Sequence, residues 1–206
     1  MRPSPRNKIY AIVEGHGEQR AVPHLIGRLL AELNCWTLFP AQKDPPFRMR
    51  SYGAFFAGNT LERAIRRHKN FSDCAALLIL LDMDDDCPKE KAFTLTRRIE
   101  QMEPLPFSVV VVCAKCEYEA WFLAGLESIH PNNTFEDNPE AIRDAKGWLN
   151  ERFDYSPIRH QANYTQKLNL SLVHSRSRSF RRLHHAIQEL IAVHQKETTI
   201  LTPTPS

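Results

Sequence analysis

The run AALLILL at residues 75–81, followed at once by DMDDD at residues 82–86, decides the fold. An uninterrupted apolar run of this length is typical of a strand that is buried on both faces. Strands of this kind occur in parallel sheets that helices cover on both sides. FSVVVVC at residues 107–113 has the same character, and KIYAIV at residues 8–13 is a third candidate strand. We therefore expect a parallel sheet built on these three strands.

Segments with apolar residues at helical spacing separate and follow the strands. We expect helices over residues 19–33, 59–69, 88–102, 118–126, 139–152 and 179–195. Residues 35–39 are a further candidate strand, and the Pro- and Gly-broken segment up to residue 58 is expected to be mostly loop. Because strands alternate with helices, the expected fold is an α/β, Rossmann-like, open and mainly parallel sheet flanked by helices, with a helical C-terminal extension.

Length and composition predict one domain. The chain has 206 residues, of which 42% are hydrophobic and 25% charged, enough for one substantial core. We divide this domain, residues 1–206, into a core at about 8–128, a helical extension at about 139–196 and a flexible tail at 197–206. No run approaches the roughly 20 apolar residues that cross a bilayer, and the N-terminus lacks an apolar signal core. A cytoplasmic protein without a membrane partner is expected.

Acidic residues follow all three strands, at Glu14, at Asp82 and Asp84, and at Glu117 and Glu119. Since the carboxyl ends of parallel strands meet at one edge of a sheet, these side chains are expected to converge. Two carboxylates about 4 Å apart repel each other by roughly 4 kcal/mol at an effective dielectric constant near 20. A hard divalent cation compensates for such repulsion, although each acid alone is also explained as a helix-terminal charge or a cap.

Several motifs resemble a known family. Glu14-Gly15 after the first strand and Asp82-x-Asp84 after the second resemble the Toprim signature of topoisomerases, primases, recombination factors and overcoming-lysogenization-defect nucleases. VEGHGEQR is similar to the VEG-x-T-E opening of those nucleases. More specifically, ILLDMDDD, CEYEAWFLA and SRSFRRLHHAI resemble the Toprim-like proteins of domain of unknown function 4276, often neighbours of an ATPase in bacterial anti-phage operons. The resemblance extends from Ile9 to about Leu190.

The resemblance implies a Toprim fold and metal-dependent chemistry on nucleic acid. It casts Glu14 as general acid/base or metal ligand, and Asp82 and Asp84 as the carboxylates that hold Mg²⁺ or Mn²⁺ beside the scissile phosphate. One or two ions are implied, and a second position would be completed by Glu18, Glu117 and Glu119. Lys115 would add positive charge near the phosphate, unless it is simply a solvated lysine.

The function implied is that of a nuclease or nickase, the effector subunit of an ATPase-containing anti-phage complex. The chain itself has no P-loop, so the ATPase would be a separate partner. Basic residues supply a candidate track for nucleic acid, with DNA favoured over RNA. They form two groups: Arg63, Arg66 and Arg67, and Arg178, Arg181 and Arg182. Solvated helix faces, or contact with an acidic partner protein, would explain the same charges.

Other interpretations fit parts of the sequence. A non-catalytic Toprim module would only bind nucleic acid or dock a partner. A receiver-like domain would accept a phosphoryl group on Asp82, but Cys113 stands where such a domain has Ser or Thr. Gly15-His16-Gly17 lacks the third glycine of a dinucleotide-binding turn. Cys113 and Cys116 have zinc or redox spacing without a second pair.

Overall fold

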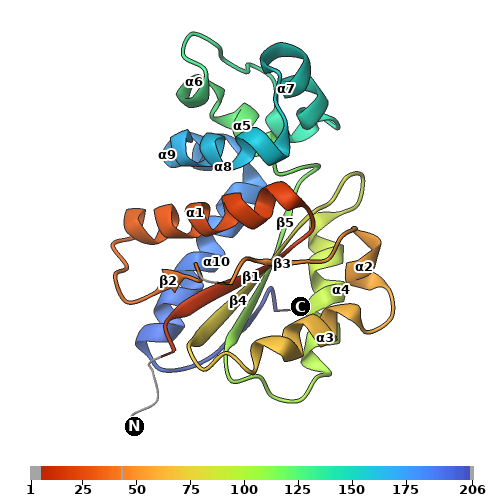
Figure 1. Ribbon diagram of the computed structural model, residues 1–206, viewed down its shortest axis with the longest axis vertical. Helices are drawn as coiled ribbons and strands as arrows, with labels where there is room; N and C mark the ends of the chain where they lie inside the picture. Colours follow the sequence, from red (N-terminus) through yellow and green to blue (C-terminus); the bar gives the residue numbers. More distant parts are fainter. Residues whose placement is uncertain (1–5, 43, 205–206) are drawn as a thin grey trace.

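The computed structural model describes residues 6–42 and 44–204 and has an α/β architecture with an open parallel sheet (Figure 1). Within these residues six strands form the sheet in the order β2-β1-β4-β5-β6, and β3 also pairs with β1. Every neighbouring pair is parallel. The strands are β1 (Lys8–Val13), β2 (Phe39–Pro40), β3 (Phe47–Arg48), β4 (Cys74–Asp82), β5 (Ser108–Ala114) and β6 (Leu201–Thr202). The expected fold class is confirmed.

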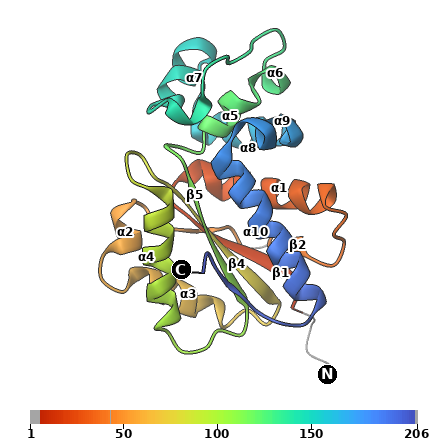
Figure 2. The ribbon, with the colours of Figure 1, turned by 180° about the vertical axis from the view of Figure 1, so that it is seen from behind.

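Alternate residues of the strands build two cores. Leu78 and Leu80 of β4 face the helices α1 (His16–Glu32) and α10 (Arg178–Gln195). Leu77 and Ile79 face the opposite layer, which consists of α2 (Gly53–Phe56), α3 (Thr60–His68) and α4 (Pro88–Glu100). All residues of β5 are buried, as expected for a strand covered on both faces. Figure 2 shows α10 and α4 on either side of β5.

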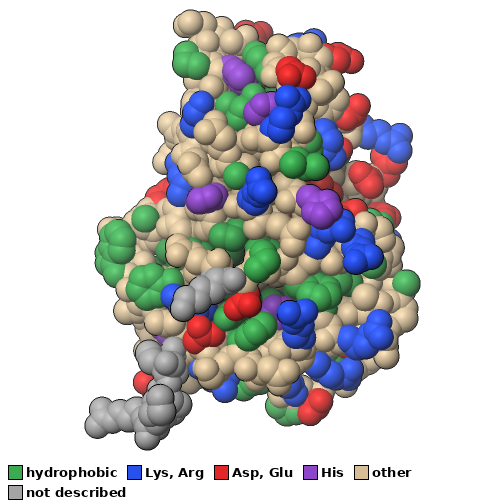
Figure 3. Space-filling view, viewed as in Figure 1, with side chains coloured by type: hydrophobic (Ala, Val, Ile, Leu, Met, Phe, Trp, Pro, Cys, Tyr) green, Lys and Arg blue, Asp and Glu red, His purple; other side chains and the backbone are tan. Residues whose placement is uncertain are grey.

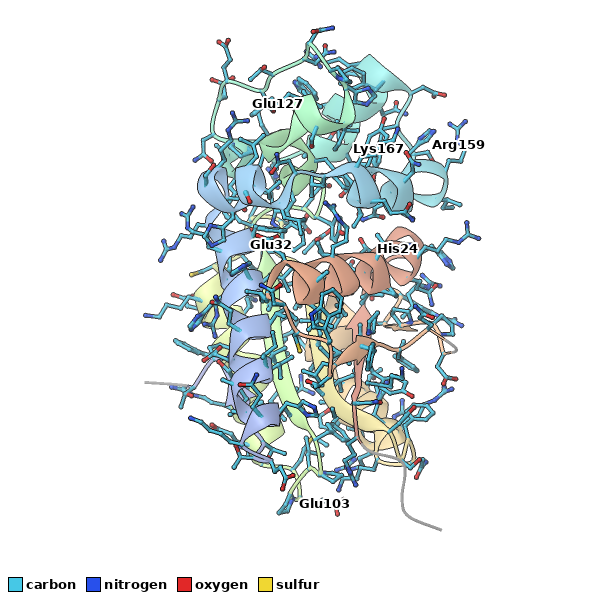
Figure 4. All side chains as sticks on the ribbon, turned by 90° about the vertical axis from the view of Figure 1, so that its left-hand side faces the viewer. His24, Glu32, Glu103, Glu127, Arg159 and Lys167 are labelled. Carbon is cyan, nitrogen blue, oxygen red and sulfur yellow. The ribbon has the colours of Figure 1, made fainter. Side chains whose placement is uncertain are left out.

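A second helical layer lies beyond the carboxyl ends of the strands, at the top of Figure 1. It contains α5 (Ala120–Ala124), α6 (Leu126–Ile129), the 3-10 helix η1 (Pro139–Ala141), α7 (Ala145–Phe153), α8 (Pro157–Lys167) and α9 (Leu170–Arg176). Helix α8 runs along α1, where Arg28 donates hydrogen bonds to the carbonyls of Thr165 and Leu168 at 2.5 and 2.6 Å. Figure 4 shows His24 on the side of α1 that faces this layer, and its Nε2 lies 3.0 Å from Nε2 of Gln166.

The C-terminal third differs most from the sequence expectation. The expected helix over 139–152 is divided, because Asp144 accepts a hydrogen bond from the Gly147 amide at 2.7 Å and starts α7 anew. Helices α8 and α9 were not expected. Helix α10 packs on the central sheet, so the extension is partly built into the core.

The tail prediction also needs correction. Residues 197–206 were expected to be flexible, but Leu201–Thr202 form β6 and pair with Val109 and Val110 of β5. Residues 205–206 lie outside the described part. No helix among the described residues combines the length and the apolar character needed to span a membrane.

Strand order sets the place of a site. Starting from β1, the chain builds β2 and β3 on one side of it and β4, β5 and β6 on the other. In open α/β sheets, ligands bind at the carboxyl ends of the strands where the strand order reverses in this way. The crevice expected from this topology lies where β1 and β4 end, next to Glu14 and Asp82.

Candidate functional site

Asp82 occupies the last position of β4 and lies among other carboxylates. It shares the sheet face of Leu78 and Leu80, which α1 covers. Its Oδ1 accepts a hydrogen bond from the backbone amide of Tyr118 at 2.9 Å. Burial raises the pKa of Asp82 well above its usual range, and the nearby carboxylates of Glu18, Glu119 and Glu14 raise it further. Acids from two other segments, the β1–α1 turn and the loop after β5, therefore lie near the end of β4.

Glu119 is the most deeply buried acid of the group, with 1% of its surface exposed. The hydroxyl of Tyr155 donates to Glu119 Oε1 at 2.9 Å, whereas Oε2 has no hydrogen-bond partner in the described part of the chain. Burial raises the pKa of Glu119 to about 7, and Lys146 opposes this increase. A buried carboxylate oxygen without a donor is costly, and a bound cation would remove the cost.

Glu18 lies in the first turn of α1, and both of its carboxylate oxygens accept hydrogen bonds. The amide of Gly15 donates to Oε2 at 2.6 Å, and Nε2 of Gln161 donates to Oε1 at 3.4 Å. Gln161 is fully buried, and its own Oε1 has no partner among the described residues. A Cβ added to Gly17 would lie 1.6 Å from Gln161 Oε1, so the absence of a side chain at Gly17 lets α8 approach.

Lys146 is the cation within this group of acids, and sequence analysis missed it. Its amide donates to Glu117 Oε2 at 2.9 Å, and its Nζ lies 3.5 Å from Glu117 Oε1. Burial alone would lower the pKa of Lys146, but Glu119 and Glu117 outweigh burial and raise it. Lys146 also lowers the pKa values of Asp82 and Glu14.

Asp84 and Glu14 lie at the open side of the group. Burial raises the pKa of Glu14, the backbone amide of Tyr52 lowers it, and Glu18 and Asp84 raise it. Asp84 is exposed and has a left-handed backbone with φ of 43°. An isolated antiparallel bridge joins Asp84 to Cys116, and the Asp84 amide donates to the Cys116 carbonyl at 3.0 Å. The loops that follow β4 and β5 are thereby fixed to each other.

Lys115 is not among the main charges that shift the pKa values of Asp82, Glu14 or Glu119. Lys115 lines a groove together with Asp85 and Asp86, and it is Lys146 that lowers the pKa values of Asp82 and Glu119. In the described part of the chain, no third ligand joins Cys113 and Cys116 to form a metal-holding group. Burial raises the pKa values of both thiols, and Cys116 Sγ donates to the Glu140 carbonyl at 3.5 Å.

The acids share a neighbourhood without forming a tight coordination sphere. Within residues 6–42 and 44–204, no three His, Cys, Asp or Glu side chains form a group arranged to hold a metal ion. The chemistry of the donors nevertheless fits a hard divalent cation, because all are oxygens and one, Glu119 Oε2, has no hydrogen-bond donor. We assign the name acidic cluster to Glu14, Glu18, Asp82, Asp84, Glu117 and Glu119.

Arg66 and Lys69, near the end of α3, lie away from the acidic cluster. Arg66 Nε and Lys69 Nζ lie 3.9 and 3.3 Å from Glu103, which precedes β5. Figure 4 shows Glu103 at the end of the molecule opposite the second helical layer. Lys and Arg side chains gather on the lower right of Figure 3, where α3 and α4 lie. Arg63 and Arg67 of α3 are also exposed.

The second predicted basic group lines the groove that contains Lys115. Arg181 Nη1 donates to the carbonyls of His174 and Ser175 at 3.0 and 3.1 Å. Arg182 Nη2 donates to Thr202 Oγ1 at 2.8 Å, and its Nη1 lies 3.8 Å from Glu189. Arg178 lies beside them at the start of α10 and is exposed.

The fold and the site define an open parallel α/β protein with clustered carboxylates at the carboxyl edge of its sheet. The chain belongs to the family described as Domain of unknown function (DUF4276), whose model matches residues 13–188. Neither the search of curated proteins nor the search of solved structures found a match.

Proposed function

We propose that this protein is a Toprim-type, metal-dependent nuclease or nickase whose acidic cluster holds Mg²⁺ or Mn²⁺ beside the scissile phosphodiester. The observation that carries the proposal is the meeting of Glu14, Glu18, Asp82 and Glu119 from three separate segments, where burial and mutual repulsion raise the pKa of Asp82. Such a group gains stability from a bound cation. The order of Glu14-Gly15 and Asp82-x-Asp84 along the chain also supports it.

The residues have distinct roles in the proposed reaction. Asp82 and Asp84 would hold the cation, and Glu119, with its unpartnered Oε2, would add a buried ligand. When bound, the cation supplies a Lewis acid for the phosphate and an activated water; two ions would stabilise the attacking and leaving oxygens separately. Glu14, whose pKa burial raises, is suited to accept or return a proton.

Lys146 takes the role that the sequence gave to Lys115. Its side chain is 44% exposed and its Nζ lies beside Glu117, so it can contact both the acidic cluster and an incoming phosphate. A cation in that position would stabilise the charge that develops on the phosphate oxygens.

We further propose that the substrate is DNA rather than RNA. A separate ATPase would control the protein, which would act as an anti-phage effector. Co-expression with a neighbouring ATPase followed by pull-down tests that association.

Cleavage of supercoiled plasmid and of labelled oligonucleotides, with Mg²⁺, Mn²⁺ or EDTA, tests the proposed activity. We expect metal-dependent nicking or cleavage that Asp82→Asn and Glu14→Gln each abolish while folding stays intact. Arg63→Gln, an exposed substitution on α3, is the matched control and should retain activity. Cleavage that survives both site variants would refute the assignment.

A non-catalytic Toprim module is the second candidate, and one observation favours it: the acids are not arranged as a tight metal-holding group within the described residues. Such a module would bind nucleic acid without cleaving it under any metal condition. The receiver-like alternative is less favoured, because Cys113 stands where a receiver domain has Ser or Thr. Labelling by a small phosphodonor, lost in Asp82→Asn, would reveal it.

A further inference from the structure

A large groove opens next to the acidic cluster, on the other side of the joined β4 and β5 loops. Its volume is about 1580 Å³. The walls are the start of α4, residues 134–140, the start of α10 and the end of β6, with Val111 and Cys113 of β5 at the floor. Figure 2 shows β5 with α4 on one side and α10 on the other.

One end of the groove reaches the proposed reaction centre. Asp85 lines the groove and directly follows Asp84, and Lys115 lines it two residues before Glu117. Two residues of extended chain span at most about 7 Å. The bridge between Asp84 and Cys116 fixes both loops in this position. The groove therefore borders the two loops that carry Asp84 and Glu117.

Most acids of the groove already have partners. Asp85 forms an ion pair with Arg143, and Asp86 accepts from Tyr52 and lies 3.1 Å from Lys91. The other engaged acids are Glu189, beside Arg182, and Glu140, which accepts from Ser177 and Ser179 at 2.6 to 2.7 Å. Glu136 and Asp137 on the outer loop have no ion pair in the described residues.

Several cationic side chains of the groove have no acidic partner among the described residues. Among the described residues, Lys89, Lys115 and Arg178 form no ion pair, and Arg181 donates only to two backbone carbonyls. Lys89 lies with its Nζ 5.5 Å from the centre of the Phe93 ring, which is partly exposed at the wall. Single-stranded nucleic acid binds to surfaces of this kind, because unpaired cations attract its phosphates and an accessible aromatic ring stacks with its bases.

We propose that this groove binds one single strand of nucleic acid and leads it to the acidic cluster. The inference rests on the proposed function for its direction, but the binding itself does not need catalysis. Lys89, Lys115, Arg178 and Arg181 contact the phosphates, and Phe93 offers a surface for a base. The α3 arginines do not line the groove and have no part in it.

Fluorescence anisotropy with a labelled single-stranded oligonucleotide in EDTA tests the groove without any cleavage. The double variant Lys89→Glu/Arg178→Glu is expected to weaken binding at least 10-fold and to reduce the slope of log K against log salt by about 1.4, since each phosphate contact on a single strand contributes about 0.7. The matched control, Arg63→Glu/Arg67→Glu, makes the same charge change on α3 and should weaken binding less than 2-fold. Circular dichroism melting confirms that both variants fold.

Equal weakening by both double variants, or none by the groove variant, would overturn the proposal. Tighter binding of a blunt duplex than of the single strand, or of an acidic peptide than of either, would also overturn it. Failure of the proposed chemistry has a different signature: single-strand binding that depends on Lys89 and Arg178, without cleavage in any metal. If the groove variant cleaves nucleic acid as fast as the wild type, the proposed nuclease activity is retained and the proposed role of the groove is rejected.

Discussion

The hydroxyl of Tyr155 donates a 2.9 Å hydrogen bond to Oε1 of Glu119 and leaves Oε2 of that buried carboxylate without a partner among the described residues. Tyr155 therefore fixes one oxygen of a buried carboxylate whose pKa is raised by burial and by Glu117 and Glu18. The energetic cost of this arrangement is measurable as a pH dependence of stability.

Metal-free Glu119→Gln should be more stable than the wild type at pH 8. The folded pKa of Glu119 is about 7, above its ordinary value of 4.5, so between these pH values the unfolded chain releases a proton that the folded protein retains. Wild-type stability therefore falls as pH rises through this window. Chemical denaturation should show a gain of a few kcal/mol at pH 8, because one pKa unit corresponds to about 1.4 kcal/mol, and little gain at pH 4.5. Exposed Glu136→Gln, the control, should show no such trend.

Asp82→Asn should separate folding from metal binding. Removing a half-buried charge that Glu18, Glu119 and Glu14 repel should raise the melting temperature of the metal-free protein. Addition of Mn²⁺ should stabilise the wild type, by about 2.7 kcal/mol at 100 times the dissociation constant. The variant should gain little. An equal Mn²⁺-induced shift in both proteins would place the ion elsewhere.

Lys146→Met should move the acidic limb of the pH–rate profile to higher pH. Lys146 lowers the pKa values of Asp82 and Glu119, so both carboxylates should ionise at higher pH when Lys146 is replaced. A shift of about 1 unit is expected for loss of a neighbouring opposite charge. Lys115→Met is the comparison variant and should leave the position of the limb unchanged. The reverse result would restore the role that sequence analysis gave to Lys115.

Gly17→Ala should weaken the packing of α8 on α1. Its Cβ would meet Gln161 Oε1 at 1.6 Å, and overpacking of this kind costs about 1–3 kcal/mol. Gly27→Ala in the same helix has only an ordinary 3.6 Å contact with Pro40 and should be neutral or stabilising by up to about 1 kcal/mol. Thermal melts of the two variants provide the comparison.

The apolar runs that became β4 and β5 were predictable, because burial on both faces removes the polar alternation of other strands. The meeting of Glu14 with Asp82 followed from parallel topology alone. Lys146 and Gln161 were not predictable as site residues, because tertiary contacts with α5 and α1 bring α7 and α8 to the acidic cluster. Strand β6 was missed because Leu201–Thr202 form only two residues of pairing within a Pro- and Thr-rich tail.

The central claim is that a divalent cation binds where β1 and β4 end. Anomalous diffraction from a crystal soaked in Mn²⁺ tests it directly. We expect a peak about 2.1 Å from a carboxylate oxygen of Asp82, with Glu14 or Glu119 as a further ligand, and no peak there in Asp82→Asn. A wild-type crystal without a peak at Asp82, or with its peak at a site that excludes these three residues, would contradict the account.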